Sequence, residues 1–272
     1  MSFENVFRGY TWDEVKAGIY AKTETDVRDA LARKTRGLAD FMALVSPAAM
    51  PLLNEIAALS QLLTQRRFGK TIQLYVPLYL SNECQNICTY CGFSYNNKIK
   101  RKTLTGAEIL QEVAAIREMG YEHVLLVTGE AQQTVGVDYF CKALDIIRPY
   151  FAHISMEVQP LDQDEYEQLI AKGLHTVLVY QETYHEADYK KHHPKGKKSN
   201  FEYRLETPDR LGRAGIHKIG LGVLLGLEDW RTDSFFTALH LSYLEKNTGK
   251  PATVSPFRGF APFPADSPRR WI

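Results

Sequence analysis

The chain has 272 residues, which is enough for one large domain or two small ones with a sizeable core. Its hydrophobic content of 44%, charged content of 24% and formal net charge of +1 are ordinary for a globular protein, and they give no electrostatic reason to expect nucleic acid as a partner. The N-terminus lacks a signal-peptide pattern, and no apolar run approaches the roughly 18 residues that span a bilayer. We therefore expect a cytoplasmic protein with no membrane partner and with reduced thiols.

The first part of the chain has the pattern of helices. Thr11-Trp-Asp-Glu offers a capped helix start, and the apolar residues of positions 48–63 recur with a helical period. No strand pattern occurs before position 71. Residues 1–70 are therefore predicted to form a helical extension.

From position 71 the pattern changes to strands that alternate with helices. Strand-like apolar runs cover residues 71–81, 123–130, 154–160, 176–182 and 218–226. Helices are expected between and after them, over residues 105–119, 137–150, 163–171, 201–214 and 230–246. Five successive strand–helix units predict a parallel sheet with right-handed crossovers, as a closed or partial (β/α) barrel over residues 71–247. A doubly wound sheet is the alternative, and both place chemistry at the carboxyl ends of the strands.

Three of the four cysteines follow the first strand within eight residues: Cys84, Cys88 and Cys91. This crowding does not suit a disulfide set, so the thiols should bind metal or do chemistry. Zinc, copper(I) and iron–sulfur clusters all take thiolate ligands, but structural zinc normally has four protein ligands. Three cysteines leave one position of a four-iron cluster open, which favours catalysis. Cys141, inside a predicted helix, is interpreted as a small buried core residue.

The Cys-x3-Cys-x2-Cys spacing, with an aromatic residue before the third cysteine, resembles the cluster motif of the radical S-adenosylmethionine enzymes. The resemblance implies a [4Fe–4S] cluster on the three cysteines, with S-adenosyl-L-methionine on the open iron. It also implies the family's (β/α) barrel, incomplete here with about five to six units. At the end of the second predicted strand, Thr128-Gly129-Glu130 matches the family's Gly-Gly-Glu-like element, except that threonine replaces the first glycine. Glu130 would then accept the amino group of the methionine moiety.

The same resemblance suggests further contacts. Tyr90 and Phe93 are expected to lie against the adenine of S-adenosylmethionine. Gln181 and Arg204 are candidates for its carboxylate or ribose, with surface or interhelix polar contacts as the alternative. Three residues near the end of the fourth predicted strand are candidates for a substrate cavity: Tyr180, Tyr184 and His185.

A narrower resemblance, to the tyrosine lyases of thiamine biosynthesis or 2-iminoacetate synthase family, runs from the N-terminal helices to about Lys246. VYQETYH at residues 179–185 and RLETPDRLGRAGI at residues 204–216 are its more specific parts. It implies cleavage of the Cα–Cβ bond of L-tyrosine to 2-iminoacetate and p-cresol, with thiazole synthase and a flavodoxin-type electron donor as partners. The alternatives are the related tyrosine-cleaving lyase of hydrogenase maturation and a non-catalytic cluster-binding fragment.

Two basic runs, at residues 98–102 and 190–198, are interpreted as solvated loops, with a docking surface for the acidic electron donor as the alternative. His192 and His193 are not expected to form a metal pair, because adjacent side chains point apart in regular structure.

The proline-rich tail, residues 248–272, fits no further helix and departs from the family, whose next strand is followed by a Ser-Phe-Pro-Arg-Leu-Arg-Pro-like motif. Codons for Phe-Pro-Arg-Leu-Arg-Pro-Phe, read one base out of frame, can encode the order of residues 257–262. We therefore hypothesise a frameshift near codon 254, and Arg258 is not assigned as the family's substrate arginine. A chain without the remaining strands is expected to expose apolar surface, to be poorly soluble and to lack lyase activity.

Overall fold

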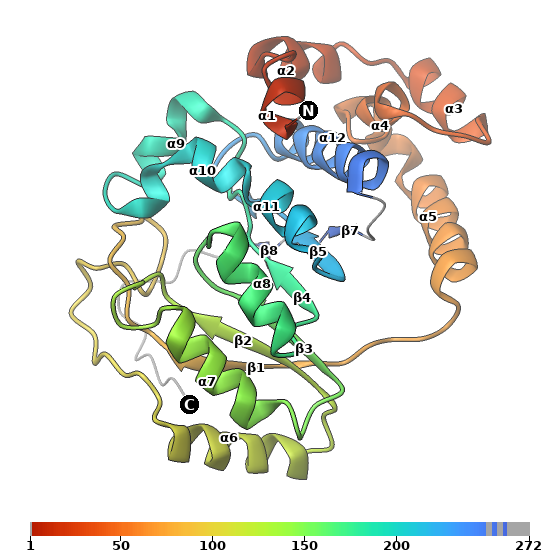
Figure 1. The fold of residues 1–272 in the computed structure, drawn as a ribbon. Helices are drawn as coiled ribbons and strands as arrows, with labels where there is room; N and C mark the ends of the chain where they lie inside the picture. Colours follow the sequence, from red (N-terminus) through yellow and green to blue (C-terminus); the bar gives the residue numbers. More distant parts are fainter. Residues whose placement is uncertain (1, 249–251, 255–257, 260–272) are drawn as a thin grey trace.

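The structure is a computed structural model that describes residues 2–248, 252–254 and 258–259 (Figure 1). Most of the proline-rich tail, and with it the segment that motivates the frameshift hypothesis, lies outside the described residues.

Every element before residue 71 is helical, as the sequence predicts. The elements are α1 (Phe3–Phe7), α2 (Trp12–Tyr20), α3 (Glu24–Ala32), α4 (Leu38–Leu44), η1 (Pro47–Leu52) and α5 (Leu53–Phe68). The expected cap of α2 is present, because the Glu14 backbone N–H donates to the Thr11 hydroxyl.

The strands form one parallel sheet in the order β1-β2-β3-β4-β5-β7. They span Val76–Ser81 (β1), His123–Thr128 (β2), His153–Glu157 (β3), Thr176–Leu178 (β4), Lys218–Leu221 (β5) and Ala252–Val254 (β7). Each strand pairs with its neighbours in chain order and the order never reverses, which confirms the barrel-type sheet over the doubly wound alternative. β6 (Leu224–Leu225) pairs separately with β8 (Arg258–Gly259).

Helices follow the strands as expected, at α6 (Gly106–Glu118), α7 (Val137–Ile147), α8 (Gln163–Ala171), α11 (Thr207–Ala214) and α12 (Trp230–Thr248). The single helix predicted over residues 201–214 is instead two helices, α10 (Phe201–Leu205) and α11. Pro208 has no backbone N–H to continue the ladder and lies in the first turn of α11, where that N–H is not needed. The chain before α10 adds α9 (Glu186–His192) and η2 (Lys197–Ser199), which the sequence pattern did not indicate.

The core lies between the sheet and its covering helices. The strand β2, which is paired on both sides, buries Val124 to Val127 without alternation, as expected for a strand covered on both faces. The N-terminal helices α2 and α4 pack on α12, and the Phe3 ring stacks on His240 at 3.6 Å (Figure 1).

α5 projects from this layer and buries none of its residues. Its exposed apolar side chains are Leu53, Leu62, Leu63 and Phe68. This apolar surface lies on the N-terminal extension rather than on the barrel, so the exposure expected of the barrel and the poor solubility both stay predictions. Among the described residues, no single helix is long and apolar enough to cross a membrane; Leu38–Leu44 and Pro47–Phe68 satisfy length and composition only together, across a 76° bend.

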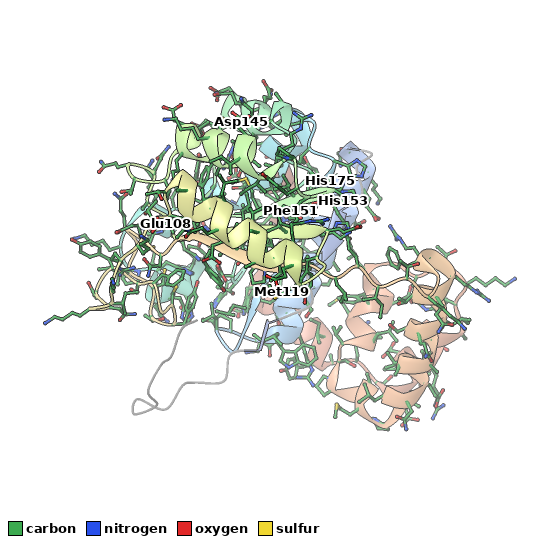
Figure 2. All side chains as sticks on the ribbon, turned by 90° about the horizontal axis from the view of Figure 1, so that it is seen from below. Glu108, Met119, Asp145, Phe151, His153 and His175 are labelled. Atoms are coloured by element: carbon green, nitrogen blue, oxygen red, sulfur yellow. The ribbon has the colours of Figure 1, made fainter. Side chains whose placement is uncertain are left out.

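Four histidines line the amino ends of successive strands, opposite the edge where the cysteines lie. Ring centroids are 4.8 Å apart for His123 and His153, 4.4 Å for His153 and His175, and 4.3 Å for His175 and His217. Figure 2 shows His153 and His175 side by side at this end. Burial and the neighbouring rings lower the pKa of His175 to about 4, so its imidazole is neutral near pH 7.

Candidate functional site

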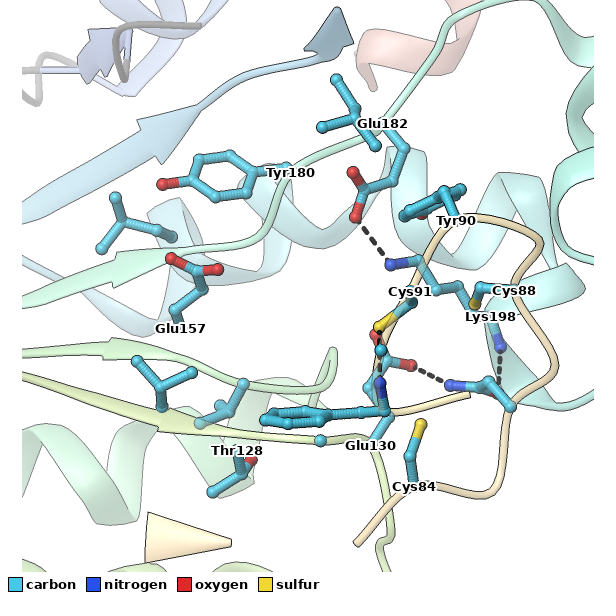
Figure 3. Close-up of a pocket in the computed structure, with 18 of the residues that line it drawn as sticks. Cys84, Cys88, Tyr90, Cys91, Thr128, Glu130, Glu157, Tyr180, Glu182 and Lys198 are labelled. Carbon is cyan, nitrogen blue, oxygen red and sulfur yellow. Dashed lines mark hydrogen bonds and ion pairs between the residues drawn. The ribbon is translucent and has the colours of Figure 1, made fainter. Parts of the chain in front are cut away.

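The candidate site is a cavity of about 300 Å³ at the carboxyl ends of the strands (Figure 3). The loop after β1 contributes all three clustered cysteines, Cys84, Cys88 and Cys91, together with Tyr90 and Phe93. Tyr79 of β1 also lines it, and the second to fifth strands and the segments that follow them contribute the rest of the wall. The sequence expectation that chemistry gathers at this edge therefore agrees with the geometry.

Backbone hydrogen bonds hold the cysteine loop against the end of β2. The Gly129 N–H donates to the Ser81 carbonyl at 3.1 Å, and the Gln85 N–H donates to the Glu130 carbonyl at 2.9 Å. A Cβ at position 129 would lie 2.2 Å from the Glu83 carbonyl oxygen, so only glycine fits there. The neighbouring Thr128 lines the cavity, and its buried hydroxyl has no hydrogen-bond partner among the described residues.

The cysteines are suited to hold a positively charged group. Burial raises the pKa of Cys88 to about 12 and also raises the pKa of Cys91. Thiolates at these positions therefore need the compensating charge of a metal. Three sulfur donors on one loop, opening into a cavity, fit a cluster with one iron left for another ligand. Cys141 lies elsewhere, in α7, half-buried against the core rather than fully buried as interpreted.

Glu130 is held by a buried cation on the opposite wall. Arg204 Nη1 lies 2.8 Å from Glu130 Oε1, and Arg204 Nε donates to the Tyr180 carbonyl at 2.6 Å. The amide of Asn86 donates to the other Glu130 oxygen at 2.8 Å. Burial alone would raise the pKa of Glu130, but Arg204 and Lys198 outweigh it and lower the pKa, so the carboxylate stays ionised.

A second ion pair crosses the same cavity. Lys198 Nζ lies 2.6 Å from Glu182 Oε1 (Figure 3). Arg204 Nη2 lies 3.6 Å from the same oxygen. Two carboxylates and two cations thus alternate across the wall, and the carboxylates raise the pKa of Lys198 well above its ordinary value despite burial. The interpretation of Lys198 as part of a solvated loop is wrong.

Tyr90 is anchored by His193. The His193 Nδ1–H donates to the Tyr189 carbonyl at 2.9 Å, so its Nε2 accepts from the Tyr90 hydroxyl at 2.7 Å. Burial lowers the pKa of His193 to about 3, which keeps the ring neutral. His192 instead faces Glu228, so the two adjacent histidines point to different partners, as expected.

Of the remaining residues predicted for the site, some line the cavity and others do not. Tyr180 lines the cavity, with Phe93, Glu130 and Arg204. Gln181 does not; it is buried, and its side-chain amide nitrogen has no hydrogen-bond partner in the described part of the chain.

Tyr184 and His185, predicted to line a substrate cavity, also lie outside it. Tyr184 is buried in the core, with its hydroxyl 3.0 Å from His240 Nδ1, and His185 stacks on Trp12. Both were expected there because they follow a strand end, but the chain has already turned away from the cavity at these positions.

Sequence reasoning did not assign four residues that line the cavity: Asn86, Glu157, Glu182 and Lys198. Glu157 had a usable signal, because it ends β3 as Thr128 ends β2. Lys198 had no usable sequence signal, because it lies within a run of exposed lysines.

These features define a barrel-type enzyme domain built around a cysteine-bound metal cluster. The chain belongs to the radical SAM superfamily, whose family profile matches residues 78–238. Members of this superfamily use a [4Fe–4S] cluster with S-adenosylmethionine.

Individual relatives are similar over most of the chain. The 2-iminoacetate synthase of Escherichia coli K12 is 56% identical over 247 residues, which cover 90% of this chain and 66% of the relative. The crystal structure of HydG, a maturase of the [FeFe]-hydrogenase, superposes with a TM-score of 0.83 at 28% identity, over 92% of this chain and 59% of HydG. Methylornithine synthase (PylB), with a TM-score of 0.62 and 22% identity over 91% of this chain and 68% of PylB, shares the fold. The chain thus spans about two thirds or less of the first two relatives.

Proposed function

We propose that this chain is the radical SAM portion of a tyrosine lyase that cleaves the Cα–Cβ bond of L-tyrosine to 2-iminoacetate and p-cresol, for the thiazole of thiamine. The observation that carries the proposal is the cavity in which the three cysteines face the Glu130–Arg204 pair. The 56% identity to a 2-iminoacetate synthase supports the choice of reaction. The related hydrogenase maturase is less similar in sequence, at 28%.

In this proposal the chain's own residues bind and orient two ligands. Cys84, Cys88 and Cys91 would hold the [4Fe–4S] cluster, which supplies the electron that cleaves S-adenosylmethionine to a carbon radical. Glu130, kept ionised by Arg204, would accept the hydrogen bonds of the methionine ammonium group.

The aromatic residues Tyr90 and Phe93 would pack against the adenine, as the sequence predicted, with Tyr90 held in place by His193. Glu157 and Tyr180 lie on the strand side of the cavity, away from the cysteine loop (Figure 3). They would supply polar groups to a tyrosine held there, while the apolar Val223 and Leu224 line the same cavity beside them.

The partners are a flavodoxin-type electron donor and a thiazole synthase that takes up the imine. Support for the donor surface comes from the basic runs, because the Lys195 carbonyl accepts from the Ile87 N–H, inside the cysteine loop. Lys98, Lys100, Lys190 and Lys195 are exposed and can face an acidic protein. Arg101 is excluded from this surface, since its guanidinium donates to the Asn82, Phe93 and Ser94 carbonyls and braces the loop instead.

An anaerobic assay tests the proposal. The chain is reconstituted with iron and sulfide, then given dithionite, S-adenosylmethionine and L-tyrosine, and 5′-deoxyadenosine and p-cresol are quantified. 5′-Deoxyadenosine is expected from the wild type and from Cys141→Ser, and not from Cys88→Ser. Formation of p-cresol as well would show that this chain suffices for the lyase reaction and would overturn the expected loss of lyase activity. Deoxyadenosine without p-cresol agrees with that expected loss, and no product despite a full iron load would overturn the enzyme proposal.

A further inference from the structure

A second group of metal-ligating side chains lies outside the cavity, where α9 approaches the start of α12. Within the described part of the chain, His185, Asp188 and Glu228 each place one ligand atom within 4.8 Å of the other two. His185 Nδ1 is 3.3 Å from Glu228 Oε2 and 3.7 Å from Asp188 Oδ2. Bonds of about 2 Å in a tetrahedron place ligand atoms about 3.3 Å apart, so a metal ion fits between these atoms after small side-chain movements.

The backbone brings these ligands together without help from a metal. His185 is the N-cap residue of α9 and Asp188 lies three residues further on, so both side chains lie on one helix face. Glu228 comes from the segment between β6 and α12. His192, one turn beyond Asp188, is 2.9 Å from Glu228 through Nε2 and the other carboxylate oxygen, which orients Oε2 toward His185.

The cluster also presents a buried ring nitrogen between two carboxylates. His185 Nδ1 is buried and makes no hydrogen bond to any described residue, although two carboxylates lie beside it. The nearby cation, Lys191, reaches Asp188 Oδ1 at 2.5 Å from outside, with its side chain 70% exposed. Solvent screens such an exposed pair, so it compensates little of the carboxylate charge. A metal ion between the three atoms would bind the free imidazole nitrogen and both carboxylates at once.

We propose that His185, Asp188 and Glu228 bind one zinc ion, with water as the fourth ligand and His192 as a positioning residue on Glu228. One imidazole and two carboxylates form a donor set that zinc accepts, whereas copper(I) prefers sulfur and magnesium prefers oxygen alone. This site is separate from the cysteine cluster, and the proposal does not depend on the lyase reaction.

The placement gives the ion a structural role. His193, the C-cap residue directly after α9, holds Tyr90 at the cavity wall, and His185 stacks on Trp12 at 4.5 Å. Zinc would therefore tie the helix behind the cluster cavity to the start of α12 and to α2.

Zinc binding is measured first in the Cys84→Ser/Cys88→Ser/Cys91→Ser chain, which removes the competing thiolates of the cluster loop. Titration calorimetry with zinc chloride should show one equivalent bound. Adding Asp188→Asn and Glu228→Gln, which keep side-chain shape, should weaken that binding at least tenfold. Circular dichroism must show that each variant is folded.

The control is Lys191→Ala, which removes the exposed cation and leaves all ligands in place. The proposal expects zinc affinity to be kept or increased. In the cluster-loaded wild-type chain, zinc should also raise the unfolding midpoint, and this shift should vanish in Asp188→Asn/Glu228→Gln. Absence of zinc binding by the folded chain without the three loop cysteines, or equal affinity in the ligand variants, would overturn the site. The second result would place the ion elsewhere, such as the histidine row of the strands.

Discussion

Replacing Arg204 by methionine is expected to destabilise the folded chain by about 3–5 kcal/mol, the usual effect of removing one partner of a buried ion pair. The Arg204 side chain is 5% exposed and lies 2.8 Å from Glu130 and 3.6 Å from Glu182. With Lys198 as the second cation, the wild-type cluster has two positive and two negative charges. The substitution leaves one excess buried carboxylate and removes the hydrogen bond to the Tyr180 carbonyl.

Urea unfolding of the metal-free, reduced chain measures this effect, with Arg28→Met as the control. Arg28 pairs with Glu24 at the surface, where the side chains are 56% and 52% exposed, so its loss should change stability by about 0.5 kcal/mol or less. The double variant Arg204→Met/Glu130→Gln should be less destabilised than the sum of its single variants, because it removes the excess charge. A loss below about 1 kcal/mol for Arg204→Met, or strict additivity, would refute the reasoning.

Two further outcomes are expected. Gly129→Ala should abolish cluster loading, measured as iron and sulfide per chain, because its Cβ meets the Glu83 carbonyl at 2.2 Å. The control Gly92→Ala should load normally, since nothing lies within 4 Å of its Cβ. A full load in both variants would contradict the packing argument. Burial lowers the pKa of His240 to about 3, so the folded state holds the neutral imidazole. The unfolded state takes up a proton near pH 6.5, so the stability of the folded state is lost progressively as the pH falls from 6.5 toward 3. Between pH 6.5 and 5 this residue should account for about 2 kcal/mol of the decrease in the free energy of unfolding. His240→Phe should reduce that decrease by the same amount. An unchanged pH dependence of the unfolding free energy would show that the buried ring is not responsible.

The sequence alone determined the features that depend on short-range order. Alternating apolar runs predicted the strands and most helices, because periods of 2 and 3.6 residues reflect local backbone geometry. The cysteine spacing predicted the cluster loop, since its three ligands lie within one short segment. Gly129-Glu130 could be placed beside them because parallel strands end at one edge of the sheet.

Only the tertiary structure decided which polar residues share the cavity. Glu130 and Arg204 are 74 positions apart, and Lys198 looks like its exposed neighbours in the sequence. At the fourth strand, β4 ends at Leu178 and Glu182 adopts a φ of 71°, so strand alternation no longer predicts side-chain direction. The Leu224 N–H donates to the Glu182 carbonyl at 2.8 Å. This contact with a distant segment accompanies the turn that places Glu182, rather than Gln181, at the cavity wall, and no local pattern records it.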